Sequence, residues 1–225
     1  MVSGSKIKYY AGNSTFTAYL TLMQNNLKEQ FGNIDIYLFD QLLKGRFDDC
    51  HKVLDAGCGS GRNIVYFLIN GFEVYGIDQS IEAIELAKNR SAALAPANPQ
   101  ENFIVCNVEE MPFADNYFDL VISSAVLHFA YNHAHFDKML HATWRVLKPG
   151  GFLFVRLASN IGIEHLVKHL GEGRYLLPDG TQRYLVDELV LLSYTNKLNA
   201  ELYEPVKTTN VQQMRCMTTW CIKKK

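Results

Sequence analysis

Apolar residues follow two kinds of pattern along this chain of 225 residues. Up to residue 50 they recur every three or four positions in two stretches, 16–27 and 34–42. This spacing predicts two amphipathic helices, because residues three and four apart lie on one helix face. Asn13 can cap the first helix, and Gly45 lies where the second would end. We therefore expect residues 1–50 to form a helical cap on the rest of the chain.

From residue 51 the pattern changes to short apolar strands that alternate with helices. The strands are expected over 52–56, 73–77, 102–106, 118–123 and 151–158, and the helices over 61–69, 81–90 and 136–147. Such alternation is typical of parallel β-α-β units. Parallel strands are covered on both faces, which fits the continuous apolar run Leu120-Val121-Ile122.

The C-terminal part is expected to add a helix over 186–198 and two strands, 201–209 and 214–222, close enough for an antiparallel hairpin. Pro205 cannot donate a ladder hydrogen bond. The first of these strands should therefore lie at the edge of the sheet and the second inside it.

Composition limits the classes of partner and the cellular location. Lys and Arg number 22 against 23 Asp and Glu, so no strong positive field attracts nucleic acid and a small-molecule partner fits better. The cysteines are odd in number, scattered and without a C-x-x-C pair, which predicts neither disulfides nor a zinc site and favours a cytoplasmic location: Cys50, Cys58, Cys106, Cys216 and Cys221. No run of about 18 apolar residues predicts a membrane span.

The most informative segment is the glycine-rich turn after strand 52–56. Glycines at Gly57, Gly59 and Gly61 allow a sharp turn and let a ligand approach the backbone N–H groups, next to the start of the expected helix. Asp78 ends the next strand, where its carboxylate can accept hydrogen bonds from both hydroxyls of a ribose. A nicotinamide dehydrogenase is disfavoured, because the G-x-G-x-x-G fingerprint needs glycine where Arg62 stands.

Four stretches in a specific order carry a resemblance to a known family. They are Asp-Ala-Gly-Cys-Gly-Ser-Gly at 55–61, Gly-Ile-Asp-Gln-Ser at 76–80, residues 107–113 leading into 118–124, and Leu-Lys-Pro-Gly-Gly at 147–151. Together they resemble the class I S-adenosylmethionine-dependent methyltransferases of the small-molecule, type 11 kind. The resemblance implies an α/β, Rossmann-like sheet of seven mostly parallel strands over 51–225, with a C-terminal antiparallel hairpin and helices on both faces.

The resemblance also implies S-adenosylmethionine as cofactor and assigns roles to individual positions. The methionine end would lie on the glycine loop and Asp55, the ribose on Asp78, the adenine beside Gln79, Asn107 and the backbone of Val108, and the sulfur beside Ser123, Ser124 and Ala125. Cys58, Asn63, Ser80 and Glu109 complete the expected cofactor site. The family usually has Asp where Asn107 stands, but an amide oxygen can still accept from the adenine amine.

Candidate catalytic chemistry is concentrated after strand 118–123. His128 is the candidate base, although its imidazole could instead pack under the cofactor or bond a loop carbonyl. No metal site is expected, because His133, His135 and Asp137 open a predicted helix, where polar residues serve as caps or surface.

The acceptor is expected to be a small molecule, and an anionic one if the arginines near residues 156–215 converge on a cleft: Arg156, Arg174, Arg183 and Arg215. The glycine-rich insertion 159–185 is too long for a simple connection and is interpreted as a substrate cover. Two alternatives stay open, a protein or RNA acceptor and a regulatory protein that binds the cofactor without catalysis. The oligomeric state is not predicted by any of these patterns.

Overall fold

The computed structural model describes residues 27–225, so almost all of the helix expected over 16–27 lies outside the described residues. Two helices precede the sheet, α2 (Leu27–Phe31) and α3 (Ile36–Leu43). Helix α3 matches the second predicted helix. Asp35 caps it by accepting a hydrogen bond from the Tyr37 N–H, and Gly45 follows it with a φ of 63°. This left-handed glycine ends the helix where the sequence predicted.

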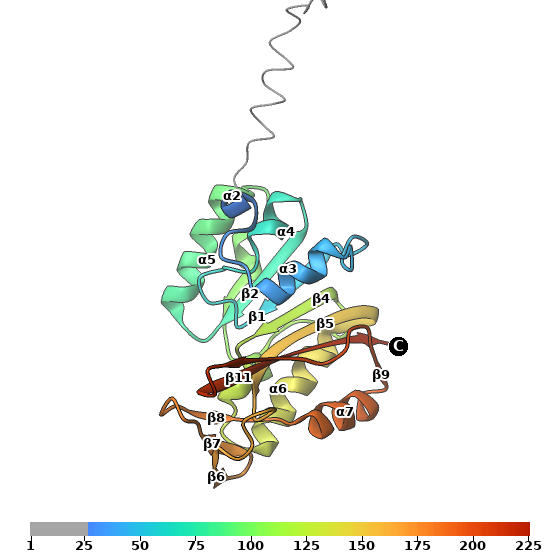
Figure 1. Cartoon of the computed structure of the whole chain (residues 1–225). Coiled ribbons are helices and arrows are strands. Elements are labelled where there is room, and N and C mark those ends of the chain that lie inside the picture. Colours follow the sequence, from blue (N-terminus) through green and yellow to red (C-terminus); the bar gives the residue numbers. More distant parts are fainter. Residues whose placement is uncertain (1–26) are drawn as a thin grey trace, which may run out of the picture.

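The main sheet has the predicted mixed architecture (Figure 1). Its strands run in the order β10-β11-β5-β4-β1-β2-β3, with β1 to β5 parallel and β11 antiparallel to both neighbours. The bounds are β1 (Lys52–Ala56), β2 (Glu73–Asp78), β3 (Phe103–Val105), β4 (Phe118–Ser124), β5 (Leu147–Ser159), β10 (Lys207–Val211) and β11 (Arg215–Lys224). The Rossmann-like sheet with a reversed C-terminal strand is therefore confirmed, with seven positions in its strand order; an eighth short strand, β9 (Ala200–Leu202), also pairs with β11.

The edge position inferred from Pro205 is also confirmed. The predicted strand 201–209 is split into β9 (Ala200–Leu202) and β10, and both pair with the same side of β11. Pro205 lies in the gap between them. The buried carboxylate of Glu204 fills the gap and pairs with Lys44 at 2.7 Å and Lys207 at 2.8 Å.

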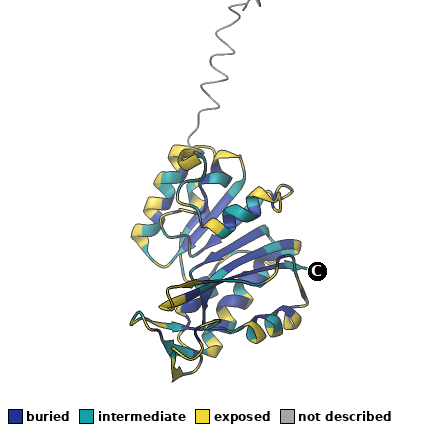
Figure 2. Cartoon of the chain, in the orientation of Figure 1, coloured by how far each residue is buried: buried dark blue, intermediate teal, exposed yellow. Residues whose placement is uncertain are grey.

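Helices cover both faces of the sheet, and each face has its own core (Figure 2). On one face lie α3, α4 (Val65–Ile69) and α5 (Ile81–Leu94), which bury Leu38, Phe67 and Ile84. On the other lie α6 (His133–Val146) and α7 (Glu188–Lys197), which bury Leu140 and Leu191. Three 3-10 turns connect these elements: η1 (Gln100–Asn102), η2 (Val108–Glu110) and η3 (Leu127–Phe129).

Two segments differ from the sequence prediction. Helix α4 begins at Val65 instead of residue 61, because Gly61 has a φ of 77° and cannot start a right-handed helix. The insertion 159–185 contains an unpredicted three-stranded antiparallel sheet of β6 (Lys168–Gly171), β7 (Arg174–Leu176) and β8 (Gln182–Tyr184). Within residues 27–225, no helix is long and apolar enough to cross a membrane.

Candidate active site

The glycine-rich turn joins β1 to α4 at the carboxyl edge of the parallel strands. Gly57, Gly59 and Gly61 all have positive φ, of 85°, 52° and 77°. The turn is fixed to the next strand because the N–H of Gly57 donates to the Ile77 carbonyl at 2.8 Å. A Cβ on Gly57 would lie 2.3 Å from Cγ2 of Val126, so a larger residue cannot fit without displacing the loop after β4. The backbone here is tightly constrained and open to a ligand on its other side.

Asp78, at the end of β2, accepts hydrogen bonds from the backbone of this turn and can accept further ones from a ligand. Its Oδ2 accepts from the Gly59 N–H at 2.9 Å, and its Oδ1 accepts from the Ser80 N–H at 3.0 Å. Each carboxylate oxygen has a second lone pair. Asp78 can therefore hold the glycine loop and also accept hydrogen bonds from two adjacent hydroxyls.

Asp55, at the end of β1, is a buried carboxylate without a partner. Its side chain is completely inaccessible, and neither oxygen has a hydrogen-bond donor among the described residues. Burial raises the pKa of Asp55 to about 7. The positive charge of Arg62 lowers this pKa in part, and the negative charge of Asp78 raises it further. An ionised carboxylate left alone in the interior is costly, and a bound ammonium group would relieve that cost.

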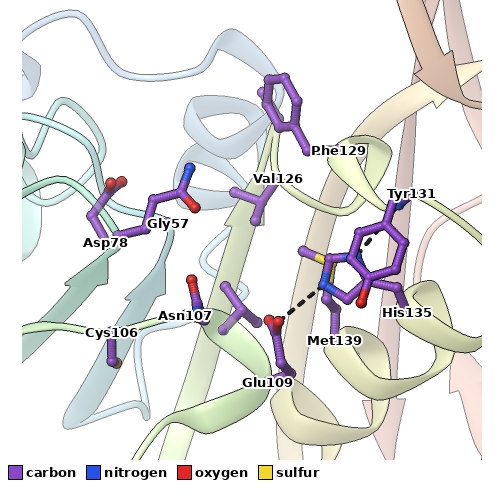
Figure 3. A pocket seen from close by; sticks show the side chains of 13 residues that line it. Gly57, Asp78, Cys106, Asn107, Glu109, Val126, Phe129, Tyr131, His135 and Met139 are labelled. Carbon is purple, nitrogen blue, oxygen red and sulfur yellow. Dashed lines mark hydrogen bonds and ion pairs between the residues drawn. The ribbon is translucent and has the colours of Figure 1, made fainter.

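A cavity of about 500 Å³ opens beside these residues (Figure 3). Asp78 lies at one end of it, and Tyr131 and His135 lie at the other, with Asn107 and Glu109 between them. Seven of the predicted cofactor residues line the cavity: Gly57, Asp78, Gln79, Asn107, Val108, Glu109 and Ala125. Six further lining residues were not predicted: Cys106, Val126, Phe129, Tyr131, His135 and Met139.

The far end of the cavity is held by a bridge between η2 and α6. Glu109 Oε1 lies 3.0 Å from His135 Nε2, and the Tyr131 ring stacks on His135 with 4.0 Å between ring centroids. Asn107 Nδ2 donates to Glu110 Oε2 at 3.0 Å, which leaves Asn107 Oδ1 available as an acceptor. An adenine amine placed here would therefore find the acceptor that the sequence analysis required.

The other predicted cofactor residues, Asp55 and Ser124 included, do not line the cavity. Cys58 packs in the core, where burial raises its pKa, and the hydroxyl of Ser80 caps α5. Ser123 is buried with its hydroxyl unpaired among the described residues. Asn63 Oδ1 accepts from the Asp35 N–H at 3.0 Å. Gly59 and Gly61 shape the turn.

Asp35 belongs to a charged cluster beneath the site that the sequence analysis missed. Its Oδ2 lies 2.8 Å from Arg156 Nη1, 3.3 Å from Ser124 Oγ and 3.5 Å from Arg62 Nη2. Asp35 is 2% exposed, so the cap residue of α3 delivers a buried negative charge to the ends of β4 and β5. The only feature of the sequence that singles out Asp35 is its position immediately before a predicted helix, which indicates a capping residue and not a contact with Arg156.

The metal site that the histidines of α6 could have suggested is not formed. His133 Nδ1 lies 2.8 Å from the Tyr184 hydroxyl, His135 pairs with Glu109, and Asp137 accepts a short hydrogen bond from Tyr194. Within residues 27–225, no three His, Cys, Asp or Glu side chains come together as metal ligands.

Comparison with known proteins agrees with this geometry. A family profile described as a methyltransferase domain matches residues 54–155. Over 109 residues the chain is 34% identical to a malonyl-[acyl-carrier protein] O-methyltransferase of Pseudescherichia vulneris, covering 48% of this chain and 39% of that protein. A structure of an S-adenosylmethionine-dependent methyltransferase from Methanosarcina mazei matches with a TM-score of 0.65 and 24% identity, covering 81% of this chain and 96% of the other.

The 1,6-didemethyltoxoflavin-N1-methyltransferase of Burkholderia thailandensis matches with a TM-score of 0.62 and 16% identity, covering 97% of this chain and 93% of the other. Residues 54–155 of the present chain belong to the methyltransferase-domain family, and its sheet has the fold of S-adenosylmethionine-dependent methyltransferases. The chain spans less than half the length of these and other curated relatives that it matches.

A second cavity, of about 310 Å³, adjoins the first at Ala125, a residue that lines both. Ala125 has a φ of 64°, a strained conformation for a residue with a side chain, at the turn that leaves β4. Three of the four arginines singled out in the sequence line this cavity: Arg156, Arg183 and Arg215. Arg174 does not line it, because it lies on β7, where its Nη2 is 3.4 Å from Gln182 Oε1.

His128 lines the second cavity but is held as a neutral side chain. Its ring is buried, and its Nδ1 accepts from the Ala158 N–H at 3.1 Å. Burial lowers the pKa of His128 to about 4, and the positive charge of Arg183 adds to this effect. A neutral imidazole that accepts at Nδ1 carries its hydrogen on Nε2. To act as the predicted base, His128 would first have to release the Ala158 N–H, so this geometry argues against that role.

Proposed function

We propose that this protein is an S-adenosylmethionine-dependent methyltransferase with a small-molecule acceptor. The observation that carries the proposal is the meeting of two cavities at Ala125, one lined by the ribose acceptor Asp78 and the other by three arginines. Methyl transfer needs two ligands to meet at one point, because the nucleophile must approach the methyl carbon opposite the sulfur.

The residues of the first cavity fit S-adenosylmethionine in its chemical parts. The ribose hydroxyls would bind at Asp78 and the adenine amine at Asn107 Oδ1, and the methionine end would lie on the backbone of Gly57. Asp55 is buried and does not line the cavity, so its negative charge would favour the amino group without contacting it. The sulfonium supplies an activated methyl group. The protein's task is then to orient the acceptor and exclude water, and orientation alone can lower a barrier by about 7–11 kcal/mol.

The acceptor is proposed to be small and anionic. The insertion contributes Leu177 to the lining of the second cavity and the β10–β11 hairpin contributes Val211, which supports the proposal that the insertion 159–185 covers the acceptor. Arg183 and Arg215 favour a carboxylate or a phosphate. The relative from Pseudescherichia vulneris is named as acting on a malonyl group carried by a protein, which is also an acid.

Ligand binding and transfer of label test this function together. Ligands that bind only the folded state raise its melting temperature. We expect stabilisation by S-adenosylmethionine and by S-adenosylhomocysteine, none by NAD, and transfer of a labelled methyl group to small-molecule acceptors. Stabilisation by NAD alone would refute the cofactor assignment. Binding of the cofactor without transfer to any acceptor would point to the regulatory alternative. The cytoplasmic location stays a prediction.

A further inference from the structure

The second cavity holds no side chain that is ready to remove a proton from the acceptor. Apart from the arginines, which stay protonated, His128 and Asp179 are the ionisable residues of its lining among residues 27–225. The basic nitrogen of His128 is occupied by the Ala158 N–H. An acceptor that arrives protonated, such as an alcohol, therefore finds no base at the imidazole.

Asp179 is a weak base for the same purpose. Its Oδ1 accepts from both the N–H and the hydroxyl of Thr181, at 2.9 and 2.6 Å. Burial raises the pKa of Asp179, but the hydrogen bonds from Thr181 and the charges of Arg215 and Arg183 outweigh burial, so the pKa is lowered overall. This carboxylate is held in its ionised form as a structural turn residue.

The charges around the cavity favour an acceptor with one negative charge. Three arginines line it, and Asp179 offsets one of them. Asp35 offsets a second, because its ion pair with Arg156 at 2.8 Å is shorter than its contact with Arg62 at 3.5 Å, and Arg62 does not line the cavity. One positive charge is left in excess, on the side formed by Arg183 and Arg215. A protonated amine would be repelled there, whereas a carboxylate is attracted and needs no base, because it is already ionised above about pH 5.

From these observations, and resting on the function proposed above, we infer that the reacting group of the acceptor is a carboxylate and that the product is a methyl ester. One carboxylate oxygen attacks the methyl carbon, and the carbon–sulfur bond breaks with its electron pair on sulfur. The negative carboxylate and the positive sulfonium become a neutral ester and a neutral thioether, and no proton is transferred.

His128 has a positioning role in this scheme. Its Nε2 has no hydrogen-bond partner among the described residues and is not among their fully buried, unpaired atoms, so Nε2–H can donate into the cavity. A donor next to Ala125 can hold the second oxygen of the carboxylate while the first one reacts. After transfer the neutral ester loses its attraction to Arg183, which favours release of the product.

The experiment uses the full chain, methyl-labelled S-adenosylmethionine and the small-molecule fraction of a cell extract. Labelled products are separated and treated with mild alkali, which releases labelled methanol from methyl esters but not from methyl ethers, methylamines or thioethers. Alkali-labile label is the expected result. Label that resists alkali would overturn the ester while leaving the methyltransferase function intact. No transfer of label, with the cofactor bound, would overturn both.

A pH profile tests the absence of a base independently. With the acid recovered from the labelled ester and with saturating S-adenosylmethionine, which keeps Asp55 in its cofactor-bound state, kcat/KM for the acid should stay within about twofold between pH 6 and pH 9. Neither the acid nor His128 changes charge in that range. His128→Gln, which keeps an N–H donor, should lower kcat/KM but leave the profile flat. A tenfold rise in the wild-type kcat/KM per pH unit below pH 8 would show that a base is required and overturn the proposal.

Discussion

Replacing Asp78 by Ala should abolish most of the binding of S-adenosylhomocysteine. The carboxylate is the proposed acceptor of two ribose hydroxyls, and hydrogen bonds to a charged group contribute about 1.5–3 kcal/mol each. Losing both therefore costs about 3–6 kcal/mol, which corresponds to a dissociation constant roughly 10²–10⁴ times larger. Isothermal titration calorimetry measures this directly, with circular dichroism to confirm that the variant is folded.

The same substitution also removes the hydrogen bonds from the N–H groups of Gly59 and Ser80, so weaker binding alone does not identify the ribose contact. A cofactor analogue that lacks the ribose hydroxyls separates the two causes. Asp78→Ala should weaken this analogue far less than S-adenosylhomocysteine, since only the loop contribution is left. Asp78→Asn, which keeps one acceptor oxygen, should lie between the wild type and Asp78→Ala. If Asp78→Ala bound S-adenosylhomocysteine within about threefold of the wild type, the assignment of the ribose site would be wrong.

Three further predictions concern a charge, a turn and the acceptor cavity. Burial raises the pKa of Asp55 to about 7 from an ordinary value of 3.8, so the folded state favours the protonated carboxyl. The wild type should therefore lose about 3 kcal/mol of stability relative to Asp55→Asn as the pH rises from 4 to 7, in denaturant titrations without cofactor. Parallel stability curves for the two proteins would contradict this. Gly57→Ala should destabilise the fold more than Gly71→Ala, since both glycines have positive φ but only the first Cβ would collide with a neighbour, and equal shifts in melting temperature would refute the clash. Arg183→Met should raise the KM for an anionic acceptor about tenfold or more, whereas Arg174→Met should not change it; equal effects of the two variants would place the anion elsewhere.

The sheet and the cofactor loop could be predicted because their signals are local. Continuous apolar runs identify buried parallel strands. Pro205 indicated the edge strand because proline has no backbone N–H to donate to a neighbouring strand. The sequence predicted that α4 would begin at residue 61, four residues too early. Gly61 belongs to the loop and has a positive φ, and the spacing of the glycines alone does not show which of them precede the helix.

The insertion sheet and the charged cluster could not be predicted for physical reasons. Strands β6 to β8 have only three or four residues each, and β6 is largely exposed, so they show no hydrophobic alternation. Asp35 contacts Ser124 and Arg156 across 89 and 121 residues of sequence. The hydrogen bond to Nδ1 of His128 comes from the backbone N–H of Ala158 on β5, so no residue pattern could indicate whether this nitrogen donates or accepts.

The ion pair between Asp35 and Arg156 gives this fold a simple way to change its acceptor. Asp35 does not line the second cavity, yet it cancels one of the charges that do. Loss of the Asp35 carboxylate would leave two excess positive charges around the second cavity, which would suit a dianion, although every residue that lines the cavity would be unchanged. The charge preferred in the acceptor can therefore evolve through a helix-capping residue that does not line the cavity.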